Sequence, residues 1–232
     1  SGSHRILLNT LLWVVLVPLV STSIGLLYAI VIDKARAESL AKALVFMPMA
    51  ISFVGASIIW KLVYDYQGVG NQIGLLNAIW VGLGGSPQRF LTNPPWNTLF
   101  LIVIMVWIQA GFAMVILSAA IKAISTDVVE AARLDGVNAR QMFRNVTLPS
   151  IRPAVIVVVT TITIATLKVF DIVRTVTGGN FDTSVVANAL YDQAFVFGDG
   201  GKGSALAVLL FVLVLPVVIY QVRVLRSQRE IR

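Results

Sequence analysis

The chain has 232 residues, of which 57% are hydrophobic and only 12% are charged. Soluble domains carry about 25% charged residues, so this composition and a mean hydropathy of +0.86 exclude an ordinary soluble fold. Cysteine is absent and His4 is the only histidine, which excludes disulfides, thiol catalysis and most zinc or haem sites.

Long apolar stretches dominate the sequence. A hydrocarbon core of ~30 Å needs about 20 helical residues at ~1.5 Å each. Stretches of about that length or longer, without a run of charges, cover residues 6–32, 40–63, 98–121, 151–169 and 204–222. They are continuous rather than alternating, which favours helices over a membrane barrel. We therefore predict an all-α integral membrane protein, a single domain over residues 1–232 built as a bundle of five transmembrane helices.

The loops between these spans differ in charge. Twelve of the eighteen Lys and Arg residues lie in the turn 33–42, the loop 122–152 and the tail after residue 222, whereas the loops 64–97 and 171–203 together hold three. The positive-inside rule places the first group in the cytoplasm, and with it the carboxyl terminus. Topology thus accounts for the net charge of +7, and we expect a lipid bilayer and no nucleic acid as partner.

Two segments lie between the last two spans. Residues 183–195 carry apolar side chains at helical spacing and predict a short helix at the membrane surface. The glycine-rich run 198–204 predicts a flexible connection. It contains Lys202 but does not meet the spacing of a phosphate-binding loop. We therefore expect no nucleotide, metal or other cofactor to be bound by this chain itself.

The segment between the third and fourth spans carries a charged motif with fixed spacing. It reads Glu130-Ala131-Ala132, three residues, Gly136, nine residues, Val146, one residue and Leu148-Pro149. The alanines leave the backbone bare, so that a partner surface is able to approach closely. The carboxylate of Glu130 is available to pair with a basic group on that partner. For each of these charges taken alone, a solvated helix face is the alternative interpretation.

The local structure of this segment follows from its capping residues. Thr126 or Asp127 is expected to cap a helix that runs through Arg133. Gly136 tolerates positive φ and predicts a turn. A second helix, 138–145, is expected to end before the proline at position 149.

The motif closely resembles the signature loop of the inner-membrane permease subunits of ATP-binding-cassette (ABC) importers, whose core is the MetI-like fold. The resemblance implies that residues 125–149 form a coupling loop that docks onto separate ABC ATPase subunits. ATP and Mg²⁺ are bound and ATP is hydrolysed there, so this chain is not an enzyme by itself. The docking residues implied are Glu130, Ala131, Ala132, Asp135, Gly136, Arg140, Leu148 and Pro149.

Other segments are similar to the maltose-type, carbohydrate-uptake branch. These are Phe170-Asp171 and the run Thr177-Gly178-Gly179-Asn180, although the branch commonly has glycine and proline where Asn180 and Phe181 stand. The resemblance implies a permease for a mono- or oligosaccharide that an extracytoplasmic substrate-binding protein delivers. It also implies a second permease subunit, identical or homologous, in a bacterial or archaeal cytoplasmic membrane. An amino terminus outside is unusual in this family, so we expect a further helix before residue 1.

Candidate residues for the substrate pathway are polar or aromatic groups within the spans, because polar side chains that face lipid are costly. Gln109 lies about 16 Å deep, at ~1.5 Å per residue, and is the main candidate. The others are Thr163, Lys168, Asp171 and Trp60. Threonines also serve in helix packing, Lys168 and Asp171 also suit an interfacial anchor, and Trp60 also suits an interfacial aromatic belt.

Other functions stay open at this point. The same kind of permease could serve another small polar solute, such as glycerol phosphate or an amino acid. A stand-alone secondary transporter or channel would usually carry ionisable residues at mid-membrane, and the spans show none there. A membrane enzyme would need a nucleophile with its base, or metal ligands, in the helices.

Overall fold

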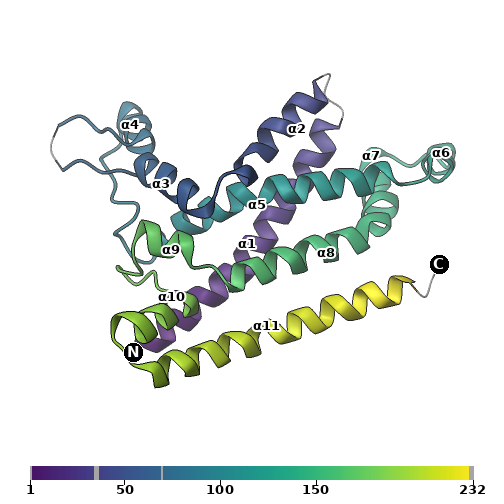
Figure 1. Ribbon diagram of the computed structural model, residues 1–232. Helices are drawn as coiled ribbons and strands as arrows, with labels where there is room; N and C mark the ends of the chain where they lie inside the picture. The colour runs from purple at the N-terminus through teal and green to yellow at the C-terminus, as the bar shows by residue number, and fades with distance from the viewer. Residues whose placement is uncertain (1, 34–36, 69, 230–232) are drawn as a thin grey trace.

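The computed structural model describes residues 2–33, 37–68 and 70–229, with side chains described up to residue 223, and this part of the chain is helical without strands (Figure 1). The elements in chain order are α1 (Gly2–Ile32), α2 (Glu38–Phe46), the 3₁₀ turn η1 (Met47–Ala50), α3 (Phe53–Val63), α4 (Leu75–Gly82), α5 (Trp96–Lys122), α6 (Thr126–Leu134), α7 (Ala139–Gln141), the π-helical turn η2 (Met142–Thr147), α8 (Leu148–Leu167), α9 (Asp171–Val176), α10 (Val186–Tyr191), the π-helical turn η3 (Asp192–Val196) and α11 (Gly200–Arg229).

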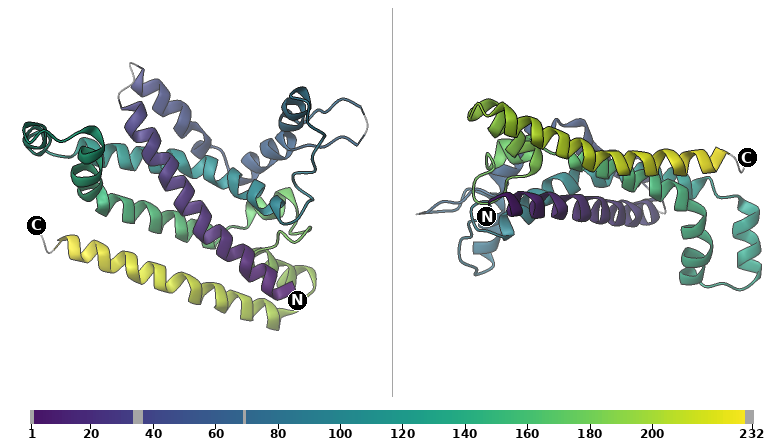
Figure 2. Two further views of the ribbon diagram at one scale, coloured as in Figure 1. Left: turned by 180° about the vertical axis from the view of Figure 1, so that it is seen from behind. Right: turned by 90° about the horizontal axis from the view of Figure 1, so that it is seen from below.

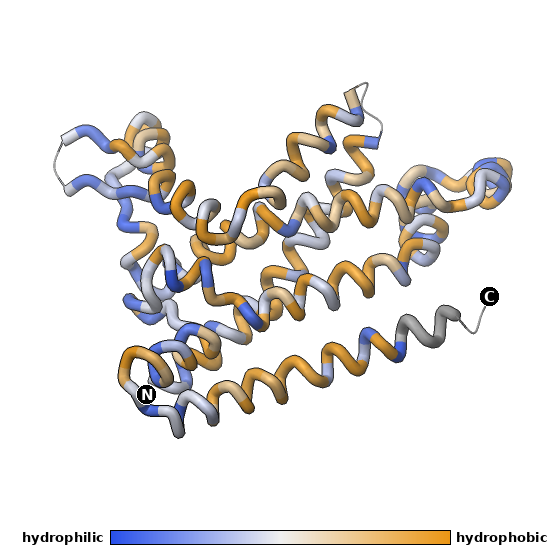
Figure 3. The backbone as a smooth tube through the Cα atoms, in the orientation of Figure 1, coloured by the Kyte–Doolittle hydropathy of each residue, from blue (hydrophilic) through white to orange (hydrophobic). Residues whose placement is uncertain are grey.

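Four helical segments of the described residues are long and apolar enough to cross a membrane: Gly2–Ile32, Trp96–Lys122, Ala139–Leu167 and Gly200–Arg223. A bent pair, Glu38–Ala50 and Phe53–Val63, gives a fifth if it is counted as one span. Hydrophobic residues run along all of them, and hydrophilic residues gather at the ends of the bundle (Figure 3). The all-α, five-span fold class predicted from the sequence is confirmed.

The second predicted span, 40–63, is not one continuous helix as the apolar run suggested. The chain bends by 102° between the two arms. Ile51 is extended, with φ −87° and ψ 138°, and Ser52 then caps α3 by accepting a hydrogen bond from the Gly55 amide at 3.1 Å. Pro48 adds to the break because it has no amide hydrogen to donate within a helix. Hydropathy does not register such a break, since apolar residues continue through it on both sides.

α5 forms the centre of the bundle, with α1 crossing it on one side and α8 beside it (Figure 2). Two glycines allow backbones to approach closely. A Cβ on Gly25 of α1 would lie 2.4 Å from the Ala113 Cβ on α5, and a Cβ on Gly111 of α5 would lie 2.5 Å from the Val45 carbonyl oxygen on α2. Small residues permit this close packing where lipid provides no hydrophobic drive. α11 lies along the edge, against α8 and α10.

The segment between α9 and α11 follows the sequence prediction in part. A short helical segment is present, but it begins at Val186 rather than at residue 183. The glycine run is not a flexible connection, because α11 already begins at Gly200. Asp199 starts this helix by accepting a hydrogen bond from the Lys202 amide at 3.0 Å, and this contact lowers the pKa of the Asp199 carboxyl.

Candidate functional site

The loop between α5 and α8, residues 125–149, is here called the signature loop. It projects from one end of the bundle, away from α4 and α9 (Figures 1 and 2). Neither α6 nor α7 nor η2 contains a buried residue. Glu130 is exposed, and Leu134 on the same helix is 89% exposed, the most exposed large hydrophobic side chain in the described part of the chain. Leu134 follows Glu130 by one helical turn, so the two exposed side chains share one face of α6, which residue spacing alone did not single out.

The turn after α6 has the geometry predicted from Gly136. That glycine has φ +74°, a conformation that L side chains rarely adopt. Its amide donates to the Arg133 carbonyl at 3.0 Å, and the Val137 amide donates to the Ala132 carbonyl at 3.3 Å. These two bonds form a Schellman motif, which satisfies carbonyls that the helix end leaves free. The start of α6 differs from the prediction, since it follows Ser125 and no side chain caps it.

The second half of the signature loop is continuous with the next span. Asn138 and Gln141 form a capping box, with side-chain to backbone bonds of 2.8 and 2.9 Å. The helix was expected to end before Pro149, but it runs unbroken from Ala139 to Leu167. The wide π-helical turn η2 precedes the proline, at the place where its ring would otherwise meet a carbonyl four residues earlier. Leu148 and Pro149 thus form the first turn of α8 and are both exposed.

The structure does not gather the five candidate pathway residues in one place. Lys168 and Asp171 flank the break between α8 and α9 and line a small cavity of about 30 Å³ together with Phe53 and Met105. Lys168 is exposed and makes no ion pair among the described residues. Trp60 lines a different cavity.

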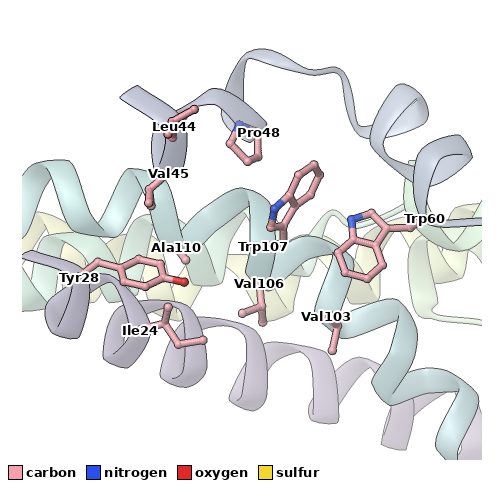
Figure 4. A pocket seen from close by; sticks show the side chains of 10 residues that line it. All are labelled: Ile24, Tyr28, Leu44, Val45, Pro48, Trp60, Val103, Val106, Trp107 and Ala110. Atoms are coloured by element: carbon pink, nitrogen blue, oxygen red, sulfur yellow. The ribbon is translucent and has the colours of Figure 1, made fainter. Parts of the chain in front are cut away.

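That second cavity measures about 380 Å³ and lies between α1, the bent pair and α5 (Figure 4). Its walls are apolar except for three aromatic side chains with polar tips: Tyr28, Trp60 and Trp107. Trp60 packs on Trp107 with ring centroids 5.7 Å apart. Aromatic faces with a hydrogen-bonding edge suit molecules that are partly apolar and partly polar.

The remaining two candidates differ in how their polar groups are used. Gln109 on α5 is 8% exposed and makes no side-chain hydrogen bond among the described residues. Thr163 donates its hydroxyl to the Val159 carbonyl of its own helix at 2.7 Å. The amide of Gln109 therefore has no partner among the described residues, whereas the Thr163 hydroxyl has one.

The opposite end of the molecule carries a hydrogen-bonded loop that residue patterns did not reveal. This α9–α10 loop, residues 177–185, contains Phe181 at φ 55° and Asp182 at φ 62°. Asn9 of α1 donates to the Asp182 and Ser184 carbonyls at 2.6 and 3.0 Å, and Asn97 of α5 donates to the Phe181 carbonyl at 2.7 Å. Arg5 also pairs with Asp182. Proline is restricted to negative φ, so Phe181 occupies a conformation that the usual residue of the carbohydrate branch would not adopt.

These features define a polytopic membrane protein with one exposed, charged loop between two of its spans. Residues 11–230 match the family described as binding-protein-dependent transport system inner membrane component, and the chain belongs to this family. The resemblance to the permease subunits of ABC importers is thereby confirmed.

Relatives and solved structures agree with this assignment. The chain is 50% identical to the osmoprotective compounds uptake permease protein GgtC of Synechocystis sp., covering 97% of this chain and 81% of that protein. It is 51% identical to the alpha-glucoside transport system permease protein AglF of Rhizobium meliloti, covering 93% and 65%. The fold is that of a bacterial alginate ABC importer, with a TM-score of 0.84 at 23% identity over 98% of this chain and 80% of that one. The MetNI methionine ABC transporter matches with a TM-score of 0.67 at 18% identity, covering 97% and 95%.

Proposed function

We propose that this chain is the permease subunit of an ATP-driven importer and forms part of the path for a small sugar or glycoside. The observation that carries the proposal is the match, at about half of all positions, to permeases named for alpha-glucosides and for osmoprotective compounds. A relative at 33% identity is named for trehalose and maltose. The likeness to the methionine transporter extends only to the fold, so it gives little support to an amino acid as substrate.

The signature loop is the proposed docking site for an ABC ATPase subunit in the cytoplasm. Glu130 and Leu134 stand exposed on α6, so one surface offers both a charge and an apolar contact. ATP and Mg²⁺ would be held by the ATPase, and this chain would contribute no catalytic group. A second permease subunit and an extracytoplasmic binding protein complete the proposed assembly in a bacterial or archaeal membrane.

Substrate contact is proposed for Gln109 and for the cavity that Lys168 and Asp171 line. Sugar hydroxyls both donate and accept hydrogen bonds, which suits an amide, an ammonium and a carboxylate. Trp60 and its larger cavity lie on another side of α5 and serve the same path only if the bundle rearranges. Thr163 is assigned to helix packing.

The test is reconstitution in vesicles with the ATPase subunits, the binding protein and a panel of glucosides. ATP-dependent uptake of a glycoside is expected, and uptake without ATP would support a stand-alone transporter instead. Gln109→Leu should lower uptake at limiting sugar by about 3- to 10-fold, the effect of one lost hydrogen bond. Thr163→Val is the matched control and should leave uptake unchanged. Equal effects of the two variants would contradict the role of Gln109.

A further inference from the structure

Five polar residues, from α2, α5 and the turn after α1, meet at the end of the bundle that carries the signature loop. They are called the ion cluster and comprise Asp33, Glu38, Lys42, Ser118 and Lys122. The Lys42 ammonium lies 2.6 Å from an Asp33 oxygen and 2.7 Å from a Glu38 oxygen, and it donates to the Ser118 hydroxyl at 2.5 Å. Ser118 in turn donates to Asp33 at 2.8 Å, and Lys122 pairs with Glu38.

The members of the cluster differ in solvent exposure. The Asp33 and Lys42 side chains are 13% and 22% exposed, and Ser118 is buried. A shared network in a partly desolvated place holds its members more firmly than an isolated surface pair, which typically contributes ~0–1 kcal/mol. Lys122 is half exposed, so its contact is the one that substitution is able to remove without leaving a buried charge.

The cluster sits beside the signature loop in the chain. Ser118 and Lys122 lie in the last turns of α5, and three residues separate Lys122 from the first residue of α6. Asp33 follows the end of α1, and Glu38 is the first residue of α2. The chain thus connects α6 to the end of α5 through three residues, and the cluster joins that end to α2.

The two arms of the bent pair belong to different parts of the bundle. α2 and η1 pack against α5, with the Val45 backbone in close contact with Gly111. α3 packs mainly against α9, at the opposite end. The break between them, at Ile51 and Ser52, is the point where the two parts join.

We propose that the ion cluster positions α2 on α5, so that movement of the signature loop carries α2 with it and bends the pair at Ile51–Ser52. The inference rests on the proposed function, because it needs a partner that moves the loop. It assigns Glu38 and Lys122 as positioning residues for coupling, at a distance from any substrate.

Charge reversal tests the contact between α2 and α5. Lys122→Glu places two carboxylates together and should lower uptake per ATP hydrolysed by at least about fivefold, the lower range of measured coupling. Lys122→Arg keeps the positive charge beside Glu38 and should retain at least half of the wild-type uptake per ATP hydrolysed. Arg152→Glu is the matched control for charge, since Arg152 is exposed on α8 and makes no ion pair among the residues described. Membrane level and ATPase retention should equal wild type in each variant.

A covalent tether gives a second, independent test. The sequence has no cysteine, so Glu38→Cys with Lys122→Cys introduces the only thiols of this chain. Uptake should be low in the untreated double variant and should rise when a short bis-maleimide joins the two thiols, because the tether replaces the ion pair. Each single-cysteine variant treated with the reagent controls for modification alone.

The outcomes separate the two proposals. If the wild-type assembly does not couple uptake to ATP hydrolysis, the proposed function fails. If the wild type couples normally but Lys122→Glu has no effect, Lys122→Arg is as impaired as Lys122→Glu, or the tether leaves uptake low or abolishes it, only the positioning role of the cluster is overturned.

Discussion

The signature loop and the α9–α10 loop lie at opposite ends of the molecule and satisfy their polar groups in different ways. The signature loop is held by local bonds, the Schellman motif at Gly136 and the capping box at Asn138, and its helices contain no buried residue. The α9–α10 loop is held by side chains far away in the chain. Asn9 is separated from the Asp182 carbonyl by 173 positions in the sequence, and Asn97 is separated from the Phe181 carbonyl by 84.

The difference shows which loop has its polar and apolar groups satisfied within the chain and which leaves some of them exposed. In the α9–α10 loop, the Thr177 and Thr183 hydroxyls are bonded to each other at 2.6 Å, and both residues are buried. Such bonds compensate the strain of positive φ at Phe181 and Asp182, which costs of order 1–3 kcal/mol per residue. The signature loop instead leaves Glu130 and Leu134 in solvent. A partner is able to bind the latter surface without breaking any bond.

The two ends of the bundle are expected to lie on opposite sides of the membrane, and this is the largest difference between them. Reporter fusions at residues 36 and 140 and at the tail should report the cytoplasm, and fusions at residues 85 and 190 should report the outside, because the basic residues gather in the first group. The measurement is paired alkaline phosphatase and fluorescent protein activity. An external residue 140 would remove the basis for docking an ATPase.

A change in the turn of the signature loop should have the next largest effect. Gly136→Pro forces φ from +74° to about −65°, which removes the Schellman motif. Combined with Glu130→Ala, it should reduce ATPase retention and binding-protein-stimulated hydrolysis to below about a tenth of wild type, since a lost charge-assisted contact alone costs ~1.5–3 kcal/mol.

Gly84→Pro is the matched control for this variant. Gly84 has φ +91°, follows α4, and its amide bonds to a carbonyl three residues earlier, as the Gly136 amide does. Its loop lies at the other end of the bundle. Coupled hydrolysis should persist in the control, and full transport by the Glu130→Ala, Gly136→Pro variant would refute the docking role.

An intermediate effect is expected at the α9–α10 loop. Asn9→Ala leaves two carbonyls without their donor and should lower the free energy of unfolding by about 1–3 kcal/mol. Thermal unfolding in detergent measures it, with Asn71→Ala, an exposed asparagine of another loop, as control. ATPase retention should stay normal. A loss of retention without a loss of stability would mean that the two loops are not independent.

The smallest effect should come from the capping box. Asn138→Ala removes one cap on an exposed helix, typically ~0.5–2 kcal/mol of local stability. Hydrogen exchange of the amides in 139–142 should accelerate, while thermal unfolding of the whole bundle should hardly change. A global loss of stability would show that the signature loop is not held by local bonds alone.

Local features of this protein could be predicted from its sequence. The apolar runs predicted the all-α, five-span fold, and Gly136 predicted its turn, because helix periodicity and positive φ depend on residues close in the chain. Predictions were wrong where a neighbouring structural feature outweighed the preference of a single residue type. Pro149 does not end its helix because a π-helical turn precedes it, and the glycine run is helical because Asp199 caps α11.

The sequence by itself determined the membrane class, the family and the position of the signature loop, since hydropathy and motif spacing are properties of consecutive residues. Only the tertiary structure decided which distant groups meet. The 102° break between α2 and α3, the anchoring of the α9–α10 loop by Asn9 and the meeting of Lys122 with Glu38 depend on how the helices pack. Helix packing brings together residues that are 84 or 173 positions apart, and no local pattern records such pairs.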